Sequence, residues 1–267
     1  MNRVVLLGLF FLMPGYFIVA QSIQKSVEAI RIKDDKAPVI DGVLNDHCWD
    51  TGIFADNFIE YEPNNGGNPS FDTKVWFTYD DNALYVGAEM LDSSPDSIHT
   101  DLSQRDEVGN SDWFMLALSP SNDGQNGFKF IVTAAGVQSD IQIIKDNDYS
   151  SWDAVWHSDV SFTDSSWTLE IKIPWSAIRF PARELHRWDV NMMREIRRYR
   201  QQSSWHFIDK SKDGRLSQTG KLTGIYAITP PLRLSILPYA SGYLNYYPQE
   251  KKPNYVMNYG ADLRLGI

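Results

Sequence analysis

The sequence is poor in cysteine, with one residue, Cys48, in a chain of 267. A single cysteine excludes an intrachain disulfide, so the folded chain must be held together by packing and hydrogen bonds. Cys48 lies beside Trp49 in an apolar patch, and this setting favours a small buried thiol over a reactive nucleophile. Stability therefore has to come from a core, for which 43% apolar residues supply the material.

Positive charge is also in short supply. The chain has 25 basic against 34 acidic side chains and a net charge of −9. This balance argues against a nucleic-acid binder, because such proteins need a dominant positive field. The local exception is a run of four arginines, which we interpret as an exposed strand paired with nearby acids: Arg194, Arg197, Arg198 and Arg200.

Recognisable catalytic motifs are missing. The sequence has no G-x-S-x-G elbow, no H-E-x-x-H, no P-loop and no dinucleotide fingerprint. Two carboxylates can hydrolyse a glycosidic bond, but 34 acids give no basis for selecting a pair. We therefore predict a protein that is not an enzyme.

A long hydrophobic run occurs at the N-terminus. Residues 1–20 contain Arg3 and then an uncharged apolar stretch that ends in Ala20, which is the pattern of a secretory signal peptide cleaved after that residue. Pro14 and Gly15 interrupt the run, which disfavours a retained membrane helix. No cysteine follows the cleavage point, so a lipoprotein anchor is not expected. The sequence predicts an exported protein of a Gram-negative bacterium, located in the periplasm, in the outer membrane or at the cell surface.

Alternation of period two is abundant, whereas long amphipathic helical patterns are absent. Residues 28–228 contain short apolar-polar segments separated by turns, which is typical of strands. Residues 113–118 are apolar on both faces, as in a central strand covered on each side. These features predict an all-β antiparallel sandwich over residues 28–228. The alternating segments are 75–79, 84–90, 128–132, 167–173 and 188–192.

The composition and the pattern of the sequence change after Pro231. Residues 232–267 contain two longer, tyrosine-rich segments around the polar turn PQEKKPN, and the second segment alternates apolar with polar residues. Such strands with aromatic flanks are typical of the opening of an outer-membrane β-barrel. Because a lone hairpin cannot close a barrel, we expect these residues to begin an incomplete, C-terminally truncated barrel domain. An extra edge hairpin of the sandwich is the alternative.

Several motifs follow one another in a familiar order. They are PVIDGVLNDHCWD (38–50), DDNALYVGAEMLD (80–92) and SDWFMLALSP (111–120), followed by FIVTAAGVQSD, SSWDAVWHSDV, WTLEIKIPWSAIRF and SQTGKLTGI. This succession resembles the family 9 carbohydrate-binding modules, which are DOMON-like β-sandwiches. It is most similar to a subgroup from Bacteroidetes-like bacteria in which the module precedes an outer-membrane barrel known as domain of unknown function 5916. The resemblance implies an exported sugar-binding module.

The resemblance also indicates where a sugar is expected to bind. Sugar-binding members hold the end of a glucan between two Trp faces and fix its hydroxyls with a carboxylate and an arginine. Their motif has a Trp three residues before an Asp and a Glu three residues after it. Asp112 matches that Asp, but Gly109 and Met115 occupy the flanking positions. Ile131 stands where the arginine is expected, so the binding set of the family is largely missing at its usual place.

Two tryptophans four residues apart, Trp152 and Trp156, flank Asp153. A helical turn or a strand puts both indoles on one side, where they would stack on a pyranose ring while Asp153 holds its hydroxyls. The alternative is that both indoles pack in the core and Asp153 caps a local turn. With both interpretations open, these three residues are ligand-binding candidates, together with Arg105 and Asp112.

Carboxylates also lie near predicted strand ends, among them Asp123 and Asp140. Calcium takes oxygen ligands from loops, and SNDGQNG (121–127) has the required composition, with Asp123 and Asn126 as candidate ligands. The segment lacks the spacing and closing Glu of an EF-hand loop. A solvated turn is the alternative.

The hypothesis that combines these observations is carbohydrate binding by an exported sandwich attached to its own outer-membrane barrel, in support of carbohydrate catabolism. The expected partners are a glycan and that barrel, with no nucleic acid. One alternative is a docking or plug domain for the barrel that binds no sugar. Another is an accessory part of a glycoside hydrolase.

Overall fold

The computed structural model describes residues 24–33, 36–231, 233–245 and 254–266, and the expected signal peptide (1–20) lies outside them. The described chain is built from strands joined by turns and three short 3-10 helices, η2 (His47–Trp49), η3 (Pro95–Ser97) and η4 (Arg197–Tyr199). Within these ranges, no helix has the length and apolarity needed to cross a membrane.

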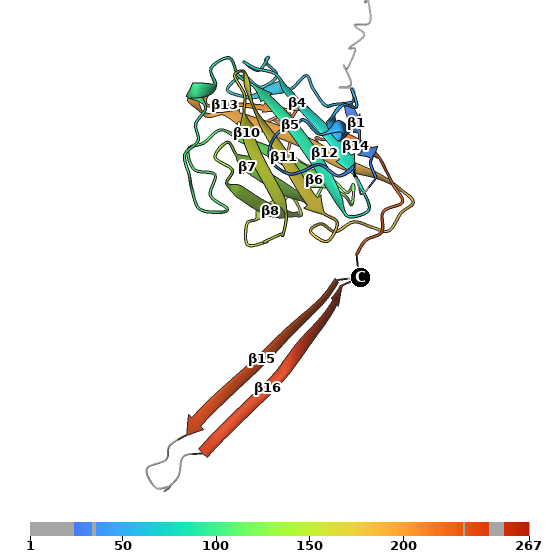
Figure 1. Cartoon of the computed structure of the whole chain (residues 1–267), viewed down its shortest axis with the longest axis vertical. Helices are drawn as coiled ribbons and strands as arrows, with labels where there is room; N and C mark the ends of the chain where they lie inside the picture. The colour runs from blue at the N-terminus through green and yellow to red at the C-terminus, as the bar shows by residue number, and fades with distance from the viewer. Residues whose placement is uncertain (1–23, 34–35, 232, 246–253, 267) are drawn as a thin grey trace, which may run out of the picture.

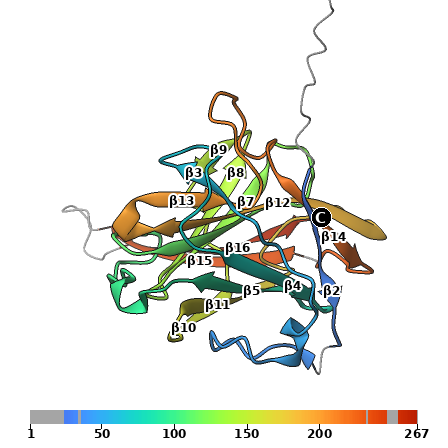
Figure 2. The same cartoon turned by 90° about the horizontal axis from the view of Figure 1, so that it is seen from above.

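The strands form two packed sheets and a separate hairpin (Figures 1 and 2). One sheet has nine strands: β1 (Ser26–Glu28), β14 (Gly220–Tyr226), β12 (Leu185–Ile196), β6 (Trp113–Ser119), β7 (Gly127–Thr133), β8 (Gln138–Ile144) and β9 (Asn147–Tyr149), with β13 (Gln201–Ser204) pairing β12 and β3 (Ile59–Glu62) pairing β13. The other has five: β10 (His157–Phe162), β11 (Ser166–Pro174), β5 (Ala83–Leu91), β4 (Thr73–Tyr79) and β2 (Ile30–Arg31). The predicted all-β sandwich is confirmed, with the parallel pairs β1–β14 and β2–β4 as exceptions to its antiparallel pairing.

The core lies between the two sheets and follows the period-two pattern of the sequence. Alternate residues of each strand point inward because successive side chains of a strand face opposite sides. The apolar positions of all five alternating segments belong to one buried cluster, among them Trp167 and Trp188. Every buried member of this cluster falls between Val27 and Ile228, so the sandwich completes its core without the C-terminal hairpin. The sandwich therefore has the packing of a unit that folds on its own.

The outer face of the five-stranded sheet is covered by the motif PVIDGVLNDHCWD (38–50). Glu170, fully buried on β11, accepts hydrogen bonds from the backbone N–H groups of Asp41 and Gly42, each at 3.0 Å, and from Nε1 of Trp49 at 2.8 Å. A side chain at Gly42 (φ +80°) would meet the backbone of Val160 at 2.4 Å, so the loop needs glycine to approach this closely. Cys48, which is part of this motif, is buried as predicted.

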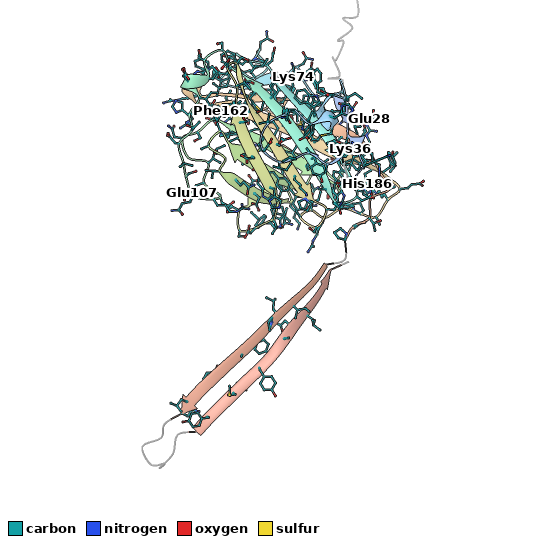
Figure 3. The ribbon with its side chains drawn as sticks, viewed as in Figure 1. Glu28, Lys36, Lys74, Glu107, Phe162 and His186 are labelled. Atoms are coloured by element: carbon teal, nitrogen blue, oxygen red, sulfur yellow. The ribbon has the colours of Figure 1, made fainter. Side chains whose placement is uncertain are left out.

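The remaining strands, β15 (Arg233–Asn245) and β16 (Asn254–Gly266), form an antiparallel hairpin with continuous register. Figures 1 and 3 show it extending away from the sandwich, and Figure 3 shows its side chains projecting into open space. Residues directly opposite each other share a face, so the register sorts the side chains into two sets. One face is apolar and aromatic: Ile236 with Leu263, Pro238 with Ala261, Ala240 with Tyr259, Gly242 with Met257, and Leu244 with Tyr255. The other is mixed: Leu237 with Asp262, Tyr239 with Gly260, Ser241 with Asn258, and Tyr243 with Val256.

Candidate functional site

The two tryptophans of the segment 148–157 are packing residues rather than an open platform. Trp156 is 4% exposed and meets Phe130 edge-on, with ring centroids 5.2 Å apart. Trp152 is half-buried and packs on Phe128 and Phe130, with centroid distances of 4.9 and 6.0 Å. The structure thus favours the packing alternative, because burial removes the ring faces of Trp156 from contact with a ligand.

Arg105 and Asp153 do come together with Trp156, through a carboxylate that the sequence left unassigned. Asp140 is fully buried and accepts hydrogen bonds from Nε1 of Trp156 (3.1 Å), from the backbone N–H of Ala154 (2.8 Å) and from the Arg105 guanidinium. Arg105 also reaches Asp153 at 3.4 Å. A shallow depression of about 520 Å³ lies over this cluster, lined by Ser103, Arg105, Gln138, Trp156, His157 and Ser158 among others.

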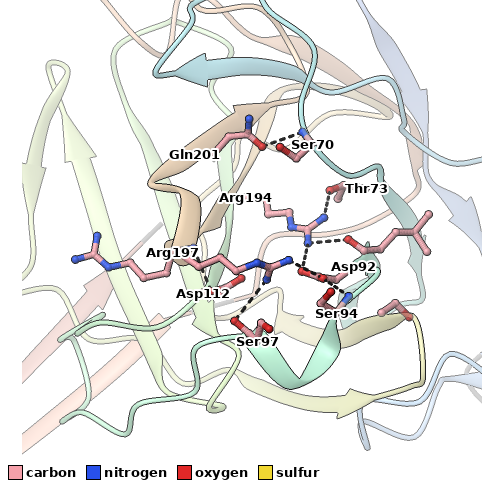
Figure 4. A network of polar contacts seen from close by, with 12 residues as sticks. Ser70, Thr73, Asp92, Ser94, Ser97, Asp112, Arg194, Arg197 and Gln201 are labelled. Carbon is pink, nitrogen blue, oxygen red and sulfur yellow. Dashed lines mark hydrogen bonds and ion pairs between the residues drawn. The ribbon is translucent and has the colours of Figure 1, made fainter.

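Asp112 is far from solvent and belongs to a structural network (Figure 4). It is fully buried, and its Oδ1 accepts hydrogen bonds from the backbone N–H groups of His99 and Arg197, at 3.3 and 3.1 Å. Burial raises the pKa of this carboxyl group, although the two backbone hydrogen bonds act in the opposite direction. As a ligand-binding candidate Asp112 is therefore misplaced, because its carboxylate points into the protein.

The arginine run is only partly the exposed strand that we expected. Arg194 is fully buried and donates from the nine-stranded sheet to the backbone carbonyls of Leu91 (2.8 Å) and Asp72 (3.2 Å) at the five-stranded sheet. Figure 4 shows its guanidinium beside Thr73 and Asp92. Arg198 donates to Oδ1 of Asp92 at 2.7 Å, and Arg194 lies 3.9 Å from the same carboxylate. The expected pairing with acids is confirmed for Arg194, Arg197 and Arg198, but the exposure predicted for Arg194 is wrong, because its guanidinium joins the two sheets.

The proposed calcium ligands form a hydrogen-bonded turn. Oδ1 of Asp123 accepts from the backbone N–H groups of Gln125 (2.9 Å) and Asn126 (2.8 Å), and Oδ2 accepts from Nδ2 of Asn126 (2.7 Å). In the part of the chain that the structure describes, no group of three or more His, Cys, Asp or Glu side chains is arranged to hold a metal ion. These contacts favour the solvated-turn alternative for residues 121–127.

A larger cleft, of about 1010 Å³, lies on the outer face of the nine-stranded sheet. Its floor crosses three neighbouring strands, where Met193 pairs with Met115 and Met115 pairs with Ile131. Ile141 continues the apolar floor on β8, and Trp113 lies on the same face as Met115, two residues earlier on β6. The alternate residues of β6 point into the core, so this strand presents apolar side chains to two different environments.

The walls of the cleft are polar. They come from β3, from the turn between β8 and β9, and from the loop between β13 and β14. Nζ of Lys129 lies 2.6 Å from Asp148, and Nζ of Lys210 lies 2.9 Å from Glu62 and 4.3 Å from the ring centre of Tyr61. Aromatic rings and an apolar floor bordered by paired charges are the composition of a binding site for a small ligand.

Sequence reasoning missed this cleft as a site, although two of its floor residues had been examined. Met115 and Ile131, which stand where the family resemblance places a Glu and an Arg, lie directly opposite each other on its floor. Residues 113–118 were expected to be covered on both sides, but Trp113 and Met115 are half-exposed in the cleft. The available signal was the alternation of Trp113, Met115 and Ala117. A strand that is apolar on both faces can bury one face in the core and form the floor of a binding cleft with the other.

Comparisons with known proteins agree with this architecture. A family 9 carbohydrate-binding module from Caldicellulosiruptor kristjanssonii in complex with glucose superposes with a TM-score of 0.52 at 15% identity, covering 78% of this chain and 100% of the module. The structure of such a module from the same organism with cellotriose gives 0.51 at 15% identity, over 77% and 100%. A putative carbohydrate-binding protein from Bacteroides uniformis gives 0.55 at 14% identity, over 75% and 99%. A search of curated proteins finds no match.

At these identities the solved structures establish the fold. Membership of a family rests on the sequence profile described as "Carbohydrate family 9 binding domain-like", which matches residues 40–197. That match covers more than half of the chain and includes most of the covering loop, the cleft floor and the buried Arg194. The chain belongs to the carbohydrate family 9 binding domain-like family.

Proposed function

We propose that this chain is an exported carbohydrate-binding module that holds a neutral glycan in the cleft on the nine-stranded sheet. The observation that carries the proposal is the position of Trp113, half-exposed at one end of an apolar floor and surrounded by polar walls. An indole ring stacks on the C–H face of a pyranose, while neighbouring polar groups bind its hydroxyls. Family membership supports this ligand class, as do the glucose and cellotriose held by the modules with the same fold.

The charges of the cleft favour a neutral ligand. Five acidic and four basic side chains line it. Lys129 is paired with Asp148, Lys210 with Glu62, and Lys212 with Asp209 at 3.3 Å. A uronic acid or a sulfated glycan would meet nearly balanced charge, which provides little attraction for either sign.

Calorimetric titration of residues 24–231 with neutral oligosaccharides, including cellotriose, tests the proposal. Trp113→Ala is expected to weaken binding by about tenfold, since aromatic contacts of this kind contribute on the order of 1 kcal/mol. Trp152→Ala is the matched control, because that indole packs outside the cleft. Absence of heat with every oligosaccharide would contradict the proposal. Binding that is unchanged in Trp113→Ala would contradict the role assigned to this indole.

We propose further that the module (28–228) follows a signal peptide (1–20) and is attached to an outer-membrane barrel whose first strands lie in residues 232–267, in support of carbohydrate catabolism. The register of the hairpin supports this, because a membrane-spanning strand presents apolar residues to lipid and polar residues to the lumen. The outer edges of β15 and β16 pair with no other strand in the described part of the chain. Both edges need partners in a bilayer, which further barrel strands would supply.

Adjacent residues on opposite faces of β15 provide the test. Ala240→Arg places a charge on the apolar face and is expected to reduce the share of the full chain that sediments with outer membranes, because a charge on the lipid side costs about 2–4 kcal/mol near mid-bilayer. Ser241→Arg places the same charge on the mixed face and is expected to leave that share unchanged. Equal behaviour of the two variants, or a wild-type chain found in the soluble fraction, would contradict barrel attachment.

A further inference from the structure

The floor of the cleft points to the class of glycan that it accepts, an inference that rests on the proposed function. We infer that the ligand carries O-acyl, O-methyl or deoxy-methyl groups, and that these groups contact the patch formed by Met193, Met115, Ile131 and Ile141. The apolar patch takes the substituent while Trp113 stacks on the sugar ring that bears it or on the next ring.

The four patch residues offer no hydrogen-bonding side chain to a sugar hydroxyl. Lys129, which lies opposite Ile141 on the same face, donates to both carboxylate oxygens of Asp148. Met115, Met193 and Ile131 carry apolar side chains, and their backbone groups face their neighbours in the ladder of β12, β6 and β7. A hydroxyl pressed onto this surface loses water without gaining a partner, which weakens binding by about tenfold for each such group. A methyl group in the same place buries apolar surface and strengthens binding about fourfold.

The shape of the patch also favours a projecting alkyl group over a flat sugar face. Pyranose faces stack on flat rings, whereas branched Ile and flexible Met form uneven surfaces that enclose methyl and acetyl groups. Trp113 and Met115 are two residues apart on one face of β6, a separation of about 7 Å. That distance is suited to a ring stacked on the indole and a substituent reaching the patch.

The patch is accessible to a ligand but shallow. Met193 and Ile131 are 8% and 9% exposed, and Met115 and Ile141 are more open. Small substituents, of the size of acetyl or methyl, therefore match it better than a long acyl chain. Three ion pairs surround the patch, and each of their charged side chains is bound to its partner rather than directed at the patch.

The decisive comparison uses one oligosaccharide in two chemical states. Residues 24–231 are titrated with O-acetylated xylo-oligosaccharides and with the same material after alkaline deacetylation. The acetylated form is expected to bind at least tenfold more tightly. Equal affinity for the two forms would overturn the inference while leaving the proposed function in place, and absence of binding to every oligosaccharide would overturn both.

Variants locate the preference. Met115→Gln and Ile131→Thr add hydrogen-bonding groups to the patch and are expected to reduce the acetyl preference to less than threefold. Met115→Leu keeps the patch apolar and is expected to preserve it. A preference that persists in the Met115→Gln, Ile131→Thr double variant would assign acetyl recognition to another part of the cleft and overturn the inference. Unfolding midpoints confirm that each variant is folded, and the wild-type comparison remains decisive if one is not.

Discussion

Trp156 donates its indole N–H to Oδ1 of Asp140, at 3.1 Å, and both side chains are buried. The same carboxylate accepts from the backbone of Ala154 and from Arg105, so a single buried charge holds the segment after β9 against the sheet. That carboxylate places Trp156, whereas Trp152 is placed by its packing on Phe128 and Phe130. The role of the two indoles in packing follows from these contacts rather than from their spacing.

Removal of this carboxylate is expected to destabilise the sandwich. Asp140→Ala leaves the Trp156 and Ala154 donors without partners, and the free energy of unfolding should fall on the order of 2–3 kcal/mol. Asp153→Ala is the control, because its side chain is 83% exposed and its loss should change stability by less than about 0.5 kcal/mol. Urea unfolding followed by tryptophan fluorescence measures both, and equal losses would contradict the role assigned to Asp140.

The loop that covers the five-stranded sheet should open when its anchor is changed. Glu170→Gln replaces one acceptor oxygen with an amide that confronts the N–H donors of the loop, weakening its attachment by about 1–3 kcal/mol. Burial, with Asp46 and Glu170 nearby, raises the pKa of Cys48 to about 12, so the native thiol is protonated and slow to react.

The reaction of Cys48 with a thiol reagent at pH 8 reports that opening. The rate should rise by roughly tenfold or more in Glu170→Gln, because the weaker attachment lowers the free energy of loop opening and exposes Cys48 more often. Glu89→Gln is the matched control, since Glu89 forms a partly exposed pair with Lys74 at 3.7 Å. A reaction rate that stays at the wild-type level in Glu170→Gln would show that the loop is held by its apolar contacts alone.

Arg194 should be the most sensitive of the four arginines. Arg194→Met removes a fully buried cation from beside Asp92 and Asp112, of which Asp92 keeps Arg198, and it removes the hydrogen bonds that join the two sheets, a loss of about 3–5 kcal/mol in unfolding free energy. Arg197→Met changes a 38% exposed side chain paired with Glu195 and should cost less than about 1 kcal/mol. Thermal unfolding distinguishes the two, and a stable Arg194→Met protein would contradict the role of this network.

Acidification below neutral pH should weaken the fold through two buried histidines. Burial lowers the pKa of both His186 and His206 below the ordinary value of 6.5. Between the lowered folded-state pKa and 6.5 the unfolded chain binds more protons than the folded one, so the stability present at pH 7.5 is lost as the pH falls from 6.5 toward the folded-state pKa. Burial raises the pKa of Asp112 and Glu170, which contribute in the opposite sense where carboxyl groups titrate.

Urea unfolding at pH 7.5 and 5.5 checks this dependence. His186→Gln with His206→Gln should flatten it, whereas His47→Gln, which changes a side chain that is 95% exposed, should not. An equal slope in the double variant and in the wild-type protein would assign the pH dependence to other groups.

The strands and the core were predictable because alternation is a local property. Residues 75–79 and 84–90 show the pattern without reference to the rest of the chain, and both became inward-facing strands of one hairpin. Arg194 was not predictable, because the partners that make its burial tolerable come from residues more than one hundred positions away.

The cleft escaped prediction for the same reason. Its floor joins β12, β6 and β7, and its walls join β3 to the loop after β13, so no local pattern contains it. Trp152 and Trp156 drew notice because they are close in sequence, yet sequence proximity says little about exposure. Trp113 was hidden in a run that looked like interior sequence on both sides.

The alternation of side chains between the two faces of the hairpin limits how its sequence can change. Each strand alternates between two unlike surfaces, so deleting a single residue from the middle of β16 would exchange the environments of all the side chains beyond that point. Paired deletions preserve the alternation, and so do conservative exchanges within one surface. Related proteins with this hairpin should therefore show insertions and deletions of even numbers of residues within its strands. The length of the turn between the strands should vary without this restriction.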